Sequence, residues 1–111
     1  MAGIAMEEFE QRILSICSEL AFVKNIFVFA STESSSLWRV TLAGDSFVDV
    51  YYSEITGKTS FAHIKDEQRV FGADNAGKWH WHPRENPASH LPSESEISFE
   101  EFMAKLEADI K

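Results

Sequence analysis

The chain has 111 residues, of which 44% are hydrophobic and 25% charged, and these ordinary globular values exclude wholesale disorder. We predict a single domain over residues 1–111, because compact domains commonly have about 100–150 residues. The net charge of −8 disfavours broad binding to nucleic-acid phosphates and favours a basic protein partner.

No targeting or membrane segment is recognisable. The start of the chain lacks a basic region, and no apolar run approaches the roughly 18 residues that a membrane span needs. Cys17 is the single cysteine, so it cannot form an internal disulfide, which fits a reducing compartment. We therefore predict a cytoplasmic protein without a membrane partner.

The two ends of the sequence predict helices. Apolar residues recur at helical spacing over about residues 6–21, at Phe9, Ile13, Ile16 and Leu20. Near the other end, Ser98 and Glu101 have the spacing of a capping box, in which each side chain satisfies a backbone N–H of the first turn. A second apolar stripe follows this cap, at Phe99, Phe102, Met103, Leu106 and Ile110.

About five strands are predicted between the helices, over residues 26–29, 37–42, 47–53, 59–65 and 68–73. Alternation is clearest in the third, where Val48, Val50 and Tyr52 share one face. The connections, such as Asp66-Glu67, are too short for parallel crossovers, so consecutive strands must be antiparallel. The predicted fold class is α+β, with both helices packed on one face of the sheet.

Residues 75–97 are predicted to be a long irregular segment. They contain all three prolines, three of the four histidines and two of the three tryptophans. Such segments are commonly functional in compact domains, and two tryptophans provide much surface to bury. If residues 79–82 are extended, His80 and His82 project to one side and Trp79 and Trp81 to the other.

Two kinds of chemistry fit this cluster. A His-x-His pair can present two imidazoles to a divalent metal such as zinc, with His90, His63, Asp74 or Glu85 as a third ligand. Without any metal or cofactor, His80 or His82 could act as general acid or base, beside Asp74, while Arg69 or Arg84 holds a phosphate. The second reading describes a metal-independent ribonuclease, whose partner is RNA.

Three pieces of the chain occur in a familiar order and spacing: residues 45–50 (DSFVDV), residues 69–76 (RVFGADNA), and residues 79–83 (WHWHP) followed by Asn86-Pro87 and His90. Over residues 37–106 they resemble the small prokaryotic TumE-like proteins, a domain of unknown function regarded as the toxin of toxin–antitoxin systems. The resemblance implies a small DNA-binding antitoxin protein as partner. It places the Asp-Asn of the family on Asp74-Asn75 and its histidine cluster on His80 and His82. Here Gly77-Lys78-Trp79 separates the two, where many relatives continue through proline into adjacent histidines.

Three hypotheses follow for function. The first is a toxin-like protein of a prokaryotic toxin–antitoxin pair that acts as a ribonuclease. The second is a noncatalytic module that binds another protein through an exposed sheet edge or the tryptophan-rich segment, and such an edge also favours a homodimer. The third is a metal-binding protein that uses His80, His82 and His90.

Overall fold

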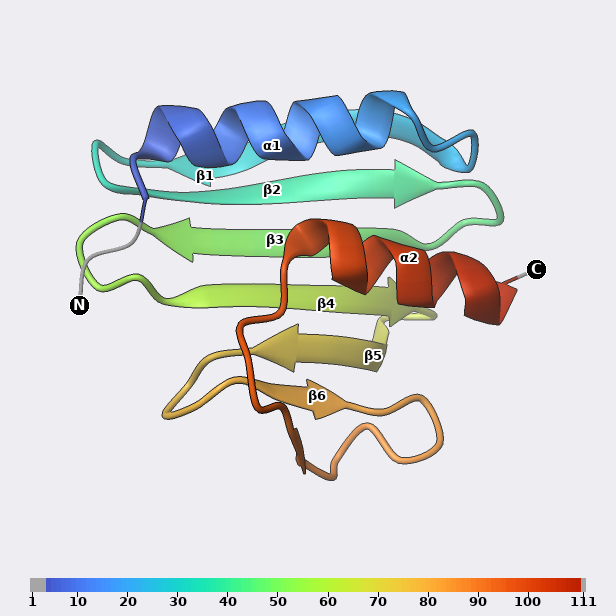
Figure 1. Cartoon of the computed structure of the whole chain (residues 1–111). Coiled ribbons are helices and arrows are strands. Elements are labelled where there is room, and N and C mark those ends of the chain that lie inside the picture. The colour runs from blue at the N-terminus through green and yellow to red at the C-terminus, as the bar shows by residue number, and fades with distance from the viewer. Residues whose placement is uncertain (1–3, 111) are drawn as a thin grey trace.

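The computed structural model describes residues 4–110. It shows a seven-stranded antiparallel sheet that is preceded by one helix and followed by another along the chain (Figure 1). This confirms the predicted α+β class. The helices are α1 (Met6–Ser18) and α2 (Phe99–Ile110). The strands are β1 (Val23–Ser31), β2 (Ser35–Leu42), β3 (Phe47–Ser53), β4 (Thr59–Lys65), β5 (Gln68–Asp74), β6 (His80–His82) and β7 (Leu91–Pro92).

The strands lie in the sheet in the order of the sequence, each paired with its neighbours along the chain. The turn at Asp66-Glu67 is as tight as predicted, and both residues have positive φ, 52° and 64°, as the two-residue hairpin turn requires. The prediction of about five strands was too low, because β6 and β7 lie in the segment predicted to be irregular. Strands of three and two residues are shorter than the runs of four to eight residues by which a sequence indicates a strand.

Both helices cover the same face of the sheet (Figure 1). The side chains of Val40, Val48 and Val50 point to this face and are fully buried. Phe102 of α2 and Ile13 of α1 are equally inaccessible, so the core forms where the two helical stripes meet the alternating strands. We call this the helix face, and the opposite face of the sheet, which carries no helix of the described chain, the bare face.

The tryptophans of the β6 region belong to the core. Trp81 is 8% exposed and its ring stacks with Phe71 and Phe102 at centroid distances of 5.7 and 6.4 Å. Trp79 is half-buried against Phe61. The packing of both indoles against the helix face fixes β6 with its histidines on the bare face.

The ends of the elements differ modestly from the predictions. The backbone N–H of Glu101 donates to Ser98 Oγ over 3.0 Å, which confirms Ser98 as the cap of α2. Helix α1 ends at Ser18 rather than at residue 21. Strand β1 is longer than the predicted 26–29 and extends over Val23–Ser31. Lys24, Asn25 and Ser31 interrupt the apolar run by which the sequence indicates this strand. The side chain of Ile110, predicted to extend the α2 stripe, lies outside the described residues. No helix within residues 4–110 is long and apolar enough to cross a membrane.

Candidate functional site

The site begins with a carboxylate at the end of β5 that faces two imidazoles of β6. In the β5–β6 register Asp74 lies opposite His80, and Gly72 lies opposite His82. Residues directly opposite each other point to the same face, so all of these side chains share the bare face. Asp74 Oδ1 is 3.2 Å from His80 Nε2, and its Oδ2 is 2.9 Å from His82 Nε2. One carboxylate therefore holds both histidines.

The remaining ring nitrogens of this pair face main-chain oxygens. His80 Nδ1 is 2.9 Å from Lys78 O, and His82 Nδ1 is 3.2 Å from Pro87 O. A carbonyl oxygen only accepts, so the hydrogen bond to Lys78 O places a proton on His80 Nδ1. His82 Nδ1 lies between Pro87 O, which only accepts, and Arg69 Nη2, which only donates. The Nε2 atoms donate to Asp74 when they carry a proton, and they are the atoms available to a metal ion when they do not.

Asp74 is suited to remain ionised in this position. Burial acts to raise its pKa, but the hydrogen bond from the Ala76 N–H, the hydrogen bond with His82 and the charge of the nearby imidazoles together bring the pKa below its usual value. The side chain is only 16% exposed. A buried carboxylate of this kind attracts a cation strongly.

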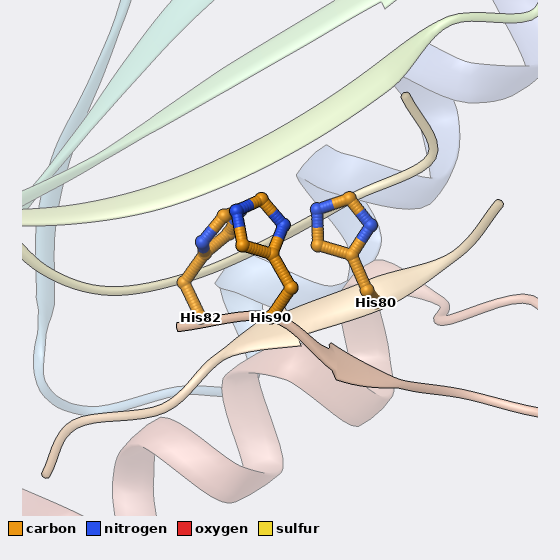
Figure 2. Close-up of side chains that lie close together, drawn as sticks. All are labelled: His80, His82 and His90. Carbon is orange, nitrogen blue, oxygen red and sulfur yellow. The ribbon is translucent and has the colours of Figure 1, made fainter. Parts of the chain in front are cut away.

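His90 completes the group from the segment that leads into β7. Its ring centroid lies 4.8 Å from that of His80 and 4.8 Å from that of His82. Figure 2 shows the three rings gathered together, with His80 and His82 rising from β6 and His90 from the adjoining segment. One nitrogen of each ring lies within 4.8 Å of the others. His90 is exposed, so the group opens to solvent on its side.

Arg69 approaches the same group along β5. Its Nη2 atom is 3.3 Å from His82 Nδ1 and 3.3 Å from Pro87 O. The lack of a side chain at Gly72 makes this approach feasible, since a Cβ there would lie 3.2 Å from Arg69 Cδ and 3.0 Å from Phe61 O. Arg69 is otherwise exposed, so it provides a positive charge beside the imidazoles.

The structure thus brings together four of the predicted acid–base residues, namely Asp74, His80, His82 and Arg69. It separates Arg84 from them. Arg84 Nη2 lies 3.2 Å from His63 Nδ1, and its Nε lies 3.3 Å from Asp109 Oδ2. His63 and Phe71, which the Arg84 guanidinium also approaches, belong to the helix face. The prediction that Arg84 holds a phosphate beside His80 and His82 was wrong, because the chain turns to the other face after β6.

His63, predicted as a possible third metal ligand beside His80 and His82, also lies on the helix face, away from these histidines. It is 2% exposed, and its Nε2 lies 3.0 Å from Ser46 Oγ. Because Arg84 can only donate, Nδ1 must accept, and Nε2 then donates to Ser46. Burial, followed by the charges of Arg84 and Lys65, lowers the pKa of His63 to about 4. This imidazole is neutral at physiological pH.

Other predicted residues have simpler places. Asn75 fastens the end of β5 to the β3–β4 connection, since it accepts from Thr59 N and donates to Gly57 O over 2.8 and 2.9 Å. Its role is structural, as its residue type favours. Glu85, considered as a metal ligand, is exposed and does not belong to the three-histidine group.

Sequence reasoning missed Gly72 and the two carbonyl groups of Lys78 and Pro87. A glycine inside an apolar strand is a signal for close approach of another group, and Gly72 could have been recognised on that ground. The carbonyls carry no signal in residue type, because they depend on how the backbone turns before and after β6.

Two hollows in the described surface lie away from the histidine group. A groove of about 930 Å³ runs between α1 and the start of α2, and a pocket of about 470 Å³ surrounds His63, Lys65 and Arg84. Neither is lined by His80, His82 or His90. The histidine group therefore lies outside both hollows, and it opens to solvent on the side of His90.

Comparison with known proteins adds no identification: no family model, curated protein or solved structure matches this chain. The chemistry of the site must be argued from its own geometry.

Proposed function

We propose that this protein binds a divalent transition-metal ion of the zinc type through His80, His82 and His90. The observation that carries the proposal is the convergence of three imidazoles, with one nitrogen of each within 4.8 Å of the others. Asp74, which touches two of the rings, supplies negative charge at the same place. Three imidazoles are a usual donor set for zinc, and a carboxylate that holds the ligand rings strengthens such a site.

The orientation of His80 and His82 supports this proposal. Metal-bound histidines commonly donate their other ring N–H to a carbonyl or carboxylate, which fixes the ring and its tautomer. Lys78 O accepts in this way from His80 Nδ1, and Pro87 O is placed to do so for His82 Nδ1, which leaves the Nε2 atoms for a cation. Two nitrogens on one tetrahedral zinc are roughly 3.4 Å apart, so binding an ion would draw the three rings, whose nearest nitrogens now lie within 4.8 Å of one another, closer together.

The number of donors favours a reactive ion over a purely structural one. Structural zinc sites are closed by four protein ligands, whereas catalytic sites keep a position open for water. With three histidines and an exposed side at His90, an ion held here would remain accessible.

Zinc titration of protein purified without a histidine tag tests the proposal. We expect about one ion per chain in the unmodified protein, and a loss of affinity of about 100-fold or more in His80→Ala and in His82→Ala. His63→Gln is the matched control, because it removes the fourth histidine on the opposite face, and it should bind zinc as the unmodified protein does. Unchanged affinity in both alanine variants, each shown to be folded by circular dichroism, would exclude this site.

A second function, the toxin-like ribonuclease, is supported by the position of Arg69. Its exposed guanidinium lies 3.3 Å from His82, so a cation, an imidazole and a carboxylate are available around one phosphate. The TumE-like resemblance and a DNA-binding antitoxin as partner belong to this proposal. For metal-independent cleavage, one imidazole has to leave Asp74 to reach the substrate.

Cleavage assays in the presence of a chelator separate the two functions. A metal-independent ribonuclease cleaves RNA in EDTA and loses activity in Arg69→Gln and His82→Ala. A zinc-dependent site loses activity in EDTA and regains it with zinc. Growth on induction, with and without the product of the adjoining gene, tests the toxin role itself, and unaffected growth in both cases would contradict it.

A further inference from the structure

The exposed apolar side chains of this protein gather at the β1 edge of the sheet. Among the described residues, six large apolar side chains are markedly exposed, and four of them are in or beside β1: Leu14, Phe27, Val28 and Phe29, with exposed fractions of 45, 51, 59 and 58%. The other two, Ile55 and Leu91, lie in different parts of the chain. A concentrated apolar patch on a small protein marks an interaction surface.

Within residues 4–110, β1 pairs with β2 alone, so its outer backbone edge has no strand beside it. It is nine residues long and contains neither proline nor glycine, and Lys24 is its only charged residue. Proteins usually protect such edges with prolines, several charges, bulges or very short strands. Of these devices β1 has register shifts between Val23 and Asn25 and between Val28 and Ala30, and Asn25–Val28 between them pair regularly with β2.

The apolar surface continues on both sides of this edge. Phe27 lies opposite Arg39, and the Phe29 ring lies 4.2 Å from the same guanidinium, so both rings are on the bare face. Val28 lies opposite the buried Trp38 and is therefore on the helix face. Arg12 of α1 lines the groove towards α2. Two residues along a helix correspond to a rotation of about 200°, so Leu14 projects from the opposite flank of α1, towards the β1 edge.

The pattern of residues along the strand fits a second copy of the same chain. Antiparallel pairing about a two-fold axis at Val28 places Phe27 opposite Phe29 of the other copy and Val28 opposite itself. The same register brings Lys24 of each copy opposite Thr32 of the other, one residue from Glu33 in the β1–β2 connection, at both ends of the pairing. A basic partner strand has no such match, because β1 contains no acidic residue.

We propose that β1 pairs antiparallel with β1 of a second copy, so that two sheets join edge to edge into one continuous sheet. The paired backbone would satisfy the free amide and carbonyl groups, and Phe27, Val28, Phe29 and Leu14 would be covered from both faces. The histidine group lies at the other end of the strand order, so the two proposals are independent.

Light scattering coupled to size exclusion tests the oligomeric state over a wide range of concentration. We expect twice the chain mass for the unmodified protein, and weakening of the dimer by about 30-fold or more in Phe27→Lys and in Val28→Lys. Ile55→Lys is the matched control, since Ile55 is 70% exposed outside the patch, and it should stay dimeric. A chain that is monomeric at all concentrations, or a dimer unaffected by both β1 variants, overturns the proposal.

Charge exchange tests the register. Lys24→Glu and Glu33→Lys should each weaken the dimer, and the double variant should regain affinity because each pair is restored with opposite signs. Hydrogen exchange provides an independent measurement: β1 amides should become protected as the protein concentration rises. Association without protection of β1, as in face-to-face stacking of the bare faces, would also overturn edge pairing.

Discussion

The two faces of the sheet each hold histidine, and the hydrogen-bond partners of the imidazoles differ. On the bare face His80 and His82 share the carboxylate of Asp74, with the Arg69 guanidinium also beside His82. On the helix face His63 receives a hydrogen bond from the guanidinium of Arg84. A carboxylate beside a ring favours a cation there, whereas a guanidinium disfavours it. The comparison teaches that burial does not define a functional histidine, because His82 and His63 are equally buried; the shared carboxylate distinguishes them.

The largest expected effect concerns His63 and pH. Its pKa of about 4 in the folded protein lies below the ordinary value of 6.5, so between these values the unfolded chain binds a proton that the folded chain does not. The free energy of unfolding should therefore fall as the pH drops from 6.5 to 4, by about 3 kcal/mol in all, and be independent of this residue above pH 6.5.

Urea denaturation at pH 7 and at pH 4.5 measures this contribution. In His63→Gln, which keeps a hydrogen-bonding group but does not titrate, the loss of stability between the two pH values should be smaller than in the unmodified protein by about 2–3 kcal/mol. Equal losses in the two proteins would show that His63 titrates normally, and the contrast between the faces would disappear.

Next in size is the effect of Asp74 on metal affinity. Asp74→Asn keeps the shape of the side chain and removes its charge, and it should weaken zinc binding by about 10- to 100-fold. Asp109→Asn is the control, because Asp109 is the carboxylate of the opposite cluster, where it accepts from Arg84, and zinc affinity should be unaffected. Isothermal titration of both variants measures the difference; equal affinities would assign Asp74 a structural role.

A smaller effect is expected at Gly72. The Cβ of Gly72→Ala would lie 3.0 Å from Phe61 O and 3.2 Å from Arg69 Cδ, and only the arginine can move easily. We expect a loss of about 1–2 kcal/mol in the free energy of unfolding, measured by urea denaturation. An unchanged midpoint would mean that the β4–β5 backbone adjusts freely. If Arg69 is the main obstacle, the additional change Arg69→Ala should recover part of the loss.

The smallest effect concerns the cation beside His63. Burial is the largest cause of its low pKa and the charge of Arg84 comes second, so Arg84→Met should raise the pKa only partway from about 4 towards 6.5. The corresponding gain in stability near pH 5 is below about 1 kcal/mol. An NMR titration of the His63 ring measures the pKa, and a value that does not rise would assign the whole shift to burial.

The sequence predicted the fold well where alternation and helical spacing are long. The stripes of α1 and α2 and the alternation of β2 to β4 depend on local contacts, and these are encoded by residue type at fixed spacing. The short β6 and β7 were missed, because their pairing depends on β5 and on the turns between them rather than on their own residues.

The candidate site was predictable in part for a similar reason. Alternation in a four-residue stretch sufficed to place His80 and His82 on one side and both indoles on the other. Arg84 was misplaced, because the turn at Pro83 carries it to the opposite face, and a spacing of two from His82 carries no information once the strand has ended. The accepting carbonyls at Lys78 and Pro87 were invisible, since every residue has one.

The serial order of the strands has a consequence for how the chain folds. Each strand finds its partner one short turn away, so the sheet can grow hairpin by hairpin without closing long loops, which favours rapid folding. The exception is α2, which is made after every strand that it covers. Phe102 of α2 packs on the rings of Phe71 and Trp81, so a chain in which α2 has not docked leaves these rings uncovered, and uncovered apolar surface favours aggregation.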